Sequence, residues 1–192
     1  MAYNFTKVKI LLVECSSEMA QLLRSVLRML TVPENNIDIA YSPEEAFEQF
    51  NQVGHDLIFT DWLEYPDRGL KFAKMIRRHP SSRNKCVPII MTAGSGHREK
   101  VIKARDYGVS DYIVKPFSAE LLARRITKII EDEREFVMSE NYVGPNRRFK
   151  DEPFEGEDRR KNTPQKEKKT IQEDKKEEEK APEEAEPKTQ EA

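Results

Sequence analysis

Five short apolar runs alternate with helical segments between residues 8 and 130. The runs occupy residues 8–13, 37–40, 57–60, 87–92 and 111–114, and their lengths are typical of strands. After the first run, apolar side chains recur at helical spacing at Met19, Leu22, Leu23, Val26, Leu27 and Leu30. Alternation of strands and helices is typical of a parallel sheet with helices on both faces, and right-handed crossovers leave few topologies. The sequence therefore predicts a doubly wound α/β fold with its five strands in the order 2-1-3-4-5.

Helix boundaries are also marked in the sequence. The segment after the second run begins with a capping box, Ser42 to Glu45, which carries a proline at its first helical position. We expect this helix to end near Gly54, and we expect the last helix to begin at Ser118.

The composition changes sharply along the 192 residues. The chain as a whole is 35% charged and has a mean hydropathy of -0.79, which is too polar for one globule that uses every residue. Bulky apolar residues are frequent up to about residue 135, whereas Ile171 is the only one between residues 161 and 192. We therefore expect a domain at 7–131 that is large enough for a core. It should be followed by a linker at 132–161 and a disordered Lys/Glu-rich tail at 162–192.

The two cysteines and the absence of long apolar runs bear on location. Cys15 and Cys86 stand in neither a CxxC nor a metal-ligand spacing, and we expect reduced thiols. No secretory signal precedes the domain, and no run approaches the roughly 18 apolar residues of a membrane span. These features favour a cytoplasmic protein without a membrane span. The net charge of -2 neither favours nor excludes a nucleic-acid partner.

Polar side chains follow four of the five expected strands. Glu14 and Cys15 follow the first, Asp61 ends the third, Thr92 ends the fourth and Lys115 follows the fifth. Because the carboxyl ends of these strands meet at one edge of such a sheet, we expect the five side chains to lie close together. Paired carboxylates can hold Mg²⁺, an ammonium and a hydroxyl can contact phosphoryl oxygens, and a carboxylate can form an acyl phosphate. The alternative for Asp61 alone is a turn or cap residue.

In combination these residues resemble the receiver domain of two-component response regulators, over residues 7–131. The matching residues are Asp61 as phosphoacceptor, Gly69 eight residues later, Thr92 as switch hydroxyl, Tyr112 as switch aromatic, and Lys115 with Pro116 as the family's Lys-Pro turn. In the family the peptide bond of that turn is usually cis, which a proline permits. Flavin proteins with the same flavodoxin-like topology are not favoured, because nothing here resembles their phosphate loop after the first strand.

The resemblance implies a bacterial phosphorelay protein that accepts a phosphoryl group on Asp61 from a histidine kinase or a histidine phosphotransfer protein. Such a domain is no classical enzyme and has only slow self-catalysed phosphotransfer and dephosphorylation. Because the residues after the domain cannot build a DNA-binding output domain, we expect output through protein binding. The expected surface is the face of the fourth helix, fifth strand and fifth helix. The alternative is a phosphorylation-independent pseudo-receiver that acts as a scaffold or adaptor.

The metal site departs from the family pattern at one position. The family usually has two carboxylates after the first strand, whereas this chain has Glu14 followed by Cys15. The resemblance implies that Glu14, Asp61 and the backbone carbonyl of Leu63 remain as Mg²⁺ ligands. A thiol suits Mg²⁺ poorly, so Cys15 is a doubtful ligand and we expect weak Mg²⁺ binding.

An internal repeat lies after the expected domain. Residues 142–148 and 154–160 share the pattern aromatic-x-Gly-x-Asn/Asp-Arg-Arg, which is similar to segments appended to some bacterial receiver proteins. Each copy offers an aromatic anchor, a turn and two arginines, and could dock on a protein or an anionic surface. The alternative is a charged linker with chance similarity. Nucleic-acid binding through the arginines is the least favoured function and would be salt-dependent.

Overall fold

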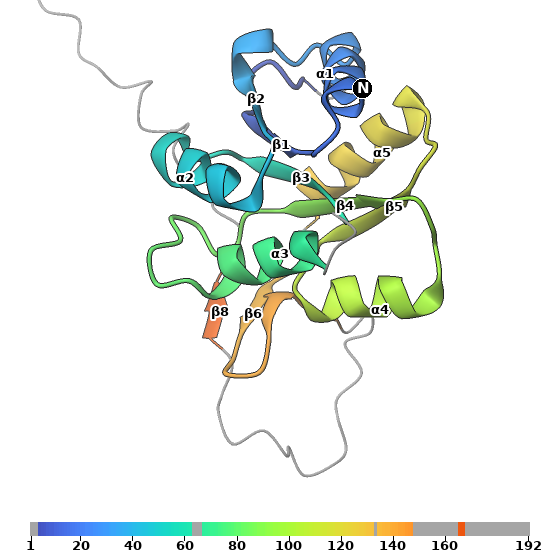
Figure 1. Ribbon diagram of the computed structural model, residues 1–192. Coiled ribbons are helices and arrows are strands. Elements are labelled where there is room, and N and C mark those ends of the chain that lie inside the picture. Colours follow the sequence, from blue (N-terminus) through green and yellow to red (C-terminus); the bar gives the residue numbers. More distant parts are fainter. Residues whose placement is uncertain (1–3, 63–66, 133, 148–164, 168–192) are drawn as a thin grey trace, which may run out of the picture.

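A computed structural model of the protein describes residues 4–62, 67–132, 134–147 and 165–167 (Figure 1). Its main sheet has five parallel strands in the order β2-β1-β3-β4-β5, which confirms the predicted topology. The strands are β1 (Ile10–Val13), β2 (Ile37–Ala40), β3 (Leu57–Asp61), β4 (Ile89–Ala93) and β5 (Asp111–Val114). The helices are α1 (Ser17–Met29), η1 (Glu34–Asn36), α2 (Pro43–Val53), α3 (Arg68–Arg78), α4 (Arg98–Asp106) and α5 (Ala119–Ile130).

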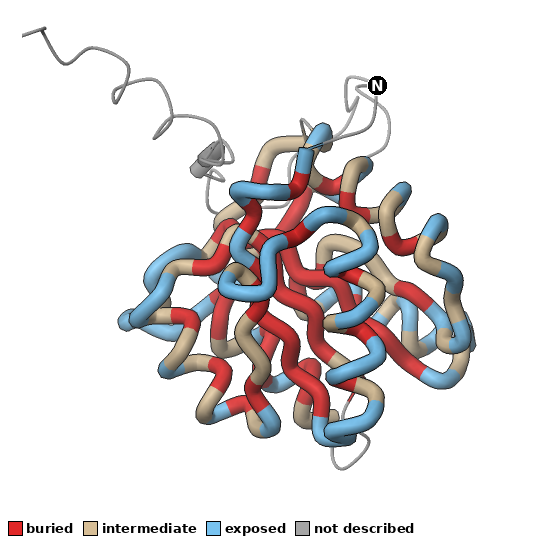
Figure 2. Tube along the Cα trace, turned by 90° about the horizontal axis from the view of Figure 1, so that it is seen from above, coloured by how far each residue is buried: buried red, intermediate tan, exposed pale blue. Residues whose placement is uncertain are grey.

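The central strands are buried on both faces. Leu11 and Ile58 belong to a core cluster with side chains of α2, α3 and α4, whereas Leu12 and Phe59 belong to a second cluster with side chains of α1 and α5. Successive residues of a strand point to opposite faces, so a continuous apolar run fills both clusters. Figure 2 shows this burial concentrated along the central strands. The apolar runs of the sequence therefore became the middle layer of a three-layer fold.

Local capping fixes the ends of several helices. The side chains of Ser16, Ser42 and Ser118 accept hydrogen bonds from backbone N–H groups in the first turns of α1, α2 and α5. Gly54 ends α2 in the left-handed region, at φ 73°, which a glycine adopts without strain. The expected start of α5 and the expected end of α2 are thus confirmed. β4 begins at Ile89, two residues later than expected, because the preceding proline has no N–H for the ladder.

The residues expected to form a linker contain a β-hairpin. Its strands β6 (Phe136–Met138) and β7 (Val143–Pro145) pair antiparallel, and a short strand β8 (Gln165–Glu167) pairs with the other edge of β6. The hairpin lies beside α3 in Figure 1, where it is coloured orange. The second copy of the repeat, and all of the expected disordered tail except residues 165–167, lie outside the described residues.

The hairpin is packed against the receiver-like domain through close backbone contacts. A Cβ atom added to Gly108 would collide with the carbonyl oxygen of Val143, and one added to Gly144 would lie 2.8 Å from the Cα of Gly108. Gly108 also has φ 83°, so its position requires glycine on two grounds. Phe136 is fully buried. These contacts make the hairpin part of the folded domain.

The buried side chain of Arg77 joins the hairpin to the domain. Its Nε donates to Gly108 O at 3.0 Å, and its Nη1 donates to Lys85 O at 2.8 Å and to Val87 O at 2.6 Å. Its guanidinium carbon lies 5.1 Å from the ring centroid of Phe136, which is a cation–π geometry. One side chain of α3 therefore contacts the loop before β4, the loop before β5 and the hairpin.

The first copy of the repeat contacts the protein's own surface. The guanidinium of Arg147 lies 3.6 Å from the ring centroid of Tyr142 and its Nη1 lies 3.0 Å from Asp106 Oδ1 at the end of α4. The hydroxyl of Tyr142 donates to Pro145 O at 2.8 Å. The aromatic residue, the glycine and the first arginine of this copy thus all serve the docking of the hairpin.

No helix among the described residues is both long enough and apolar enough to cross a membrane.

Candidate functional site

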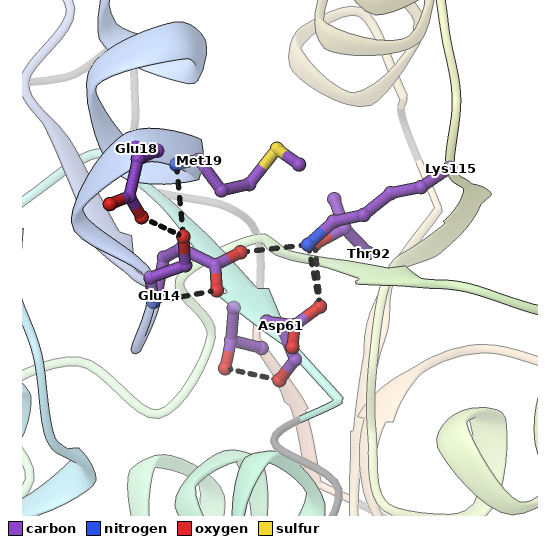
Figure 3. A network of polar contacts seen from close by, with 8 residues as sticks. Glu14, Glu18, Met19, Asp61, Thr92 and Lys115 are labelled. Atoms are coloured by element: carbon purple, nitrogen blue, oxygen red, sulfur yellow. Dashed lines mark hydrogen bonds and ion pairs between the residues drawn. The ribbon is translucent and has the colours of Figure 1, made fainter.

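Four of the predicted site residues come together at the carboxyl edge of the sheet. Glu14 follows β1, Asp61 ends β3, and Lys115 follows β5. Thr92 lies in β4 directly beside Asp61 in the strand register. This placement follows from the parallel topology, because every strand of the main sheet delivers its last residue to the same edge. Figure 3 shows the four side chains facing one another.

Lys115 lies between the two carboxylates. Its Nζ is 2.7 Å from Glu14 Oε2 and 2.8 Å from Asp61 Oδ1. The side chains are largely shielded from solvent, with exposed fractions of 17% for Lys115, 6% for Glu14 and 18% for Asp61. Burial acts to lower the pKa of Lys115, but its hydrogen bonds to Asp61 and Glu14 prevail and the pKa is raised. The site therefore holds a firmly charged ammonium against its acidic groups.

The backbone around Lys115 sets the direction of its side chain. Lys115 N donates to Ala93 O at 2.8 Å, which extends the pairing of β5 with β4 by one residue. The peptide bond between Lys115 and Pro116 is cis, which confirms the expectation from the family resemblance. Ser118 then caps α5, so the chain leaves the site immediately after the lysine.

Thr92 places a hydroxyl beside the carboxylate of Asp61. Its Oγ1 lies 3.5 Å from Asp61 Oδ1, at the long limit of a hydrogen bond, and the residue is buried. A hydroxyl can rotate to donate to an oxygen of a group that is attached to the carboxylate. Thr92 is thus positioned to contact a group attached to Asp61.

Gly69 keeps the backbone near Asp61 compact. A Cβ atom at this position would collide with the backbone carbonyl oxygen of Asp61, and Gly69 N donates to Trp62 O at 3.2 Å. The spacing of Asp61 and Gly69 noted in the sequence therefore has a steric basis.

Tyr112 lies on β5 with its side chain directed toward the loop after β4. Its hydroxyl donates to Ser95 O at 2.7 Å, and its ring meets the ring of Trp62 edge-on at 6.4 Å between centroids. Burial raises the pKa of Tyr112, and the charge of Asp61 adds to this effect. The charge of Asp61 therefore acts on the aromatic residue that the family resemblance identified.

The donor atoms at this edge of the sheet differ in how well they suit Mg²⁺. Glu14 and Asp61 offer hard carboxylate oxygens, which Mg²⁺ prefers. Cys15 offers a thiol, and its Sγ is exposed and lies 3.6 Å from Tyr41 O. Leu63 lies outside the described residues. Where the structure describes the chain, it contains no group of three or more His, Cys, Asp or Glu side chains that could hold a metal ion. The two carboxylates fit Mg²⁺ and the thiol does not.

Sequence reasoning missed one polar group beside the site. Trp62, which directly follows Asp61, is buried, and its Nε1 donates to Asp67 Oδ1 at 3.1 Å. Lys103 of α4 forms an ion pair with the same carboxylate. Asp67 stands between Pro66 and Gly69, residue types that are typical of turns, but no periodicity relates it to a lysine 36 residues away.

Comparison with known proteins was consistent with this geometry. Residues 10–127 match the model of the response regulator receiver domain. The chemotaxis protein CheY-3 of Vibrio cholerae is 32% identical over 124 residues, which cover 65% of this chain and 92% of that protein. The chemotaxis protein CheY of Pseudomonas aeruginosa is 31% identical and is covered to 97%, again with 65% of this chain.

Solved structures show the same fold. A two-component response regulator from Clostridium difficile has a TM-score of 0.57 at 26% identity, and the match covers 66% of this chain and 98% of that chain. Chemotaxis protein CheY4 of Vibrio cholerae has the same TM-score at 24% identity, with 64% of this chain and 98% of that chain covered. The matched part corresponds to the five-stranded domain.

Proposed function

Because this chain belongs to the response regulator receiver family, we propose that it is a cytoplasmic phosphorelay protein whose Asp61 accepts a phosphoryl group. The donor would be a histidine kinase or a histidine phosphotransfer protein. The observation that carries the proposal is the ammonium of Lys115 held between Asp61 and Glu14 at a shielded sheet edge. A structural ion pair needs no second carboxylate and no adjacent buried hydroxyl.

The geometry supports a simple transfer step. A carboxylate oxygen of Asp61 attacks the phosphorus of a phosphohistidine, the P–N bond breaks as the P–O bond forms, and its electron pair leaves on the imidazole. Lys115 already donates to Asp61 Oδ1, so its charge is in place when negative charge builds up on the phosphoryl oxygens. Thr92 then offers a hydroxyl to a phosphoryl oxygen. These groups orient and stabilise, and turnover of the acyl phosphate would be slow and self-catalysed.

Glu14 and Asp61 are the residues that would hold Mg²⁺, and when bound the ion supplies positive charge that favours negatively charged phosphoryl oxygens. Binding would be weak for two reasons. Cys15 stands where a third hard oxygen would be useful, and Lys115 already neutralises part of the negative charge of both carboxylates.

Replacing Cys15 by aspartate is expected to strengthen Mg²⁺ binding by about tenfold or more, since a missing hard ligand would be supplied. The measurement is a Mg²⁺ titration followed by the fluorescence of Trp62, the single tryptophan of the chain. The matched control is Cys15→Ser, which removes the thiol without adding a carboxylate. Equal affinities of the Cys15→Asp and Cys15→Ser proteins would contradict the role given to position 15.

The output partner would be a protein that binds the face of α4, β5 and α5. Two apolar side chains on this face, Val101 of α4 and Val114 of β5, are exposed by 38% and 40%. Apolar groups rimmed by charged ones are typical of protein-binding surfaces. Tyr112 of β5 is connected by its hydroxyl to the loop before α4, which gives this face a contact path to the site.

The test of the proposed function is labelling of the full chain with acetyl phosphate, with and without Mg²⁺. We expect one phosphoryl group per chain, lost in the Asp61→Asn variant, while Asp56→Asn is labelled like the wild type. A chain that accepts no phosphoryl group from acetyl phosphate or from a histidine kinase would instead be a pseudo-receiver scaffold. The replacement of a usual acidic residue by Cys15 is the observation that favours this second candidate.

A further inference from the structure

Helix α4 buries little apolar surface, and charged side chains make several of its contacts. All of its residues are described, and Ala104 is the single buried one among them. By comparison, α3 buries six residues, and its packing alone can position it. A helix with so little apolar contact has a low local stability, so its position depends on the few side chains that fix it.

One of these fixed points is Asp67, the residue before α3. Lys103 of α4 forms an ion pair with Asp67 Oδ2, and Trp62 Nε1 donates to Asp67 Oδ1 at 3.1 Å. Lys100, one turn earlier on α4, places its Nζ 5.2 Å from the centroid of the Trp62 ring. The hydrogen bond from Lys103 is the main cause of a lowered pKa of Asp67. The carboxylate of Asp67 therefore accepts hydrogen bonds from Trp62, beside the phosphoacceptor, and from Lys103 of α4 at the same time.

Trp62, which donates to Asp67, is connected to the phosphoacceptor Asp61 through the backbone. Trp62 directly follows Asp61, and its N donates to Thr92 O at 2.9 Å. Asp67 itself has φ 55°, a left-handed conformation that costs energy for a residue with a side chain. Aspartate adopts this conformation more readily than most residues do, and the two partners of its carboxylate stabilise it further. Displacement of Lys103 would therefore change the position of the Asp67 carboxylate and of its partner Trp62. Asp61, which is bonded to Trp62 by one peptide bond, would be affected in turn.

We infer that Asp67 is a positioning residue that couples the phosphoacceptor loop to α4, with Trp62 on one side of its carboxylate and Lys103 on the other. The inference rests on the proposed function for its effect on phosphorylation, but the coupling itself is a property of the unmodified protein. If modification of Asp61 shifts α4 through this contact, thermodynamic reciprocity requires that a protein that binds and orders α4 favours the receptive arrangement of Asp61.

Conservative variants test the coupling. Asp67→Asn keeps an acceptor for Trp62 and tolerates the left-handed conformation, but it removes the charge that Lys103 needs. Lys103→Met keeps most of the length of the side chain and removes its charge. The matched control is Glu44→Gln, which removes the charge of the 3.2 Å ion pair with Arg68 at the same end of α3. Among the described residues, Glu44 forms no ion pair with α4.

We expect Asp67→Asn and Lys103→Met each to slow labelling of Asp61 by acetyl phosphate by about two- to fivefold, the range of a partly exposed charge pair. The double variant should be no slower than either single one, because both remove the same contact. In the unlabelled proteins, amide hydrogen exchange of α4 should become faster by a similar factor. Glu44→Gln should change neither quantity.

Two results would overturn the inference. One is an unchanged exchange rate of α4 in both unlabelled variants, and the other is additive slowing in the double variant. Failure of the proposed function would look different, since the wild type would then take up no label at all. In that case the exchange rates of α4 in the unlabelled proteins still decide whether Asp67 and Lys103 hold the helix.

Discussion

Replacement of Arg77 by alanine is expected to lower the free energy of unfolding by about 3 kcal/mol, which is large for a single residue of a receiver domain. The substitution removes three hydrogen bonds at once and leaves the carbonyl oxygens of Gly108, Lys85 and Val87 without the guanidinium. It also opens a cavity beneath the ring of Phe136, and unfilled space in a core adds to the loss. Chemical denaturation of the full chain measures the effect.

The neighbouring residue provides a matched control. Arg78 is exposed and makes one hydrogen bond, from Nη1 to Glu140 O at 2.6 Å, so Arg78→Ala should cost less than about 1 kcal/mol. Arg77→Lys should lie between the two, because an ammonium cannot reproduce the fork of the guanidinium. If Arg77→Ala and Arg78→Ala were equally stable, the buried network would not hold the hairpin and α3 together.

The charge of Arg77 is expected to persist in the core. Burial lowers the pKa of Arg77 to about 10. This value is still well above neutral pH, so the group remains protonated there. The three hydrogen bonds of the guanidinium go to backbone carbonyl oxygens, whose dipoles partly replace the water that the buried charge has lost. Loss of any of these carbonyl contacts would leave a buried cation less well solvated.

The fold was predictable because its main determinants are local or periodic. Strand length, helical spacing and caps such as Ser42 and Gly54 are all visible in one dimension, and the parallel alternation then leaves one favoured strand order. The convergence of Glu14, Asp61 and Lys115 followed from that order alone, because it depends on strand ends and not on details of packing.

The hairpin was missed because its stability depends on contacts far apart in the sequence. Phe136 and its neighbours are apolar, but the run is too short to distinguish a strand from a linker. The hairpin packs against Gly108 and Arg77, and nothing in the sequence around either residue predicts this contact. Arg77 occupies a position one turn after Ala73 on the buried side of α3, where a charged residue normally indicates the surface.

The pair of Asp67 and Lys103 was missed for a related reason. An exposed-looking charge in a turn and a lysine on a polar helix are individually ordinary, and their contact depends on how α4 lies against the start of α3. Trp62 directly follows Asp61 in the sequence, but its hydrogen bond to Asp67 depends on how the chain folds after the strand. The residues of a site at the strand ends are thus easier to predict from sequence than the contacts of the neighbouring side chains that hold the site in position.

Replacement of Lys115 by methionine is expected to slow labelling of Asp61 by about 10²-fold, the usual cost of removing one preorganised donor to developing negative charge. Met retains the apolar stem and all but the terminal atom of the side chain, so the main change is the loss of the charge. It leaves the carboxylates of Glu14 and Asp61 facing each other without the ammonium, both largely shielded from water. The measurement is the rate of acetyl phosphate labelling at saturating Mg²⁺. Lys128→Met, which removes an exposed lysine of α5, is the matched control and should be labelled at the wild-type rate.

The unfolding free energies of the wild type and Lys115→Met, measured over a series of pH values, separate the effect of the Lys115 charge from the effect of its packing. The pKa of Lys115 is raised above its ordinary value of 10.5, because its hydrogen bonds to Asp61 and Glu14 outweigh burial. A raised pKa means that the folded protein binds the proton more tightly than the unfolded chain, so the stabilisation is fully present below pH 10.5 and is lost as the pH rises through the folded pKa. The difference in unfolding free energy between wild type and Lys115→Met should therefore be constant from neutral pH to about pH 10 and shrink above it. If the difference in unfolding free energy stayed constant into strong alkali, the contribution of Lys115 to stability would come from packing of its apolar stem. The charge of its ammonium would then not be what stabilises the contact between the ends of β1, β3 and β5.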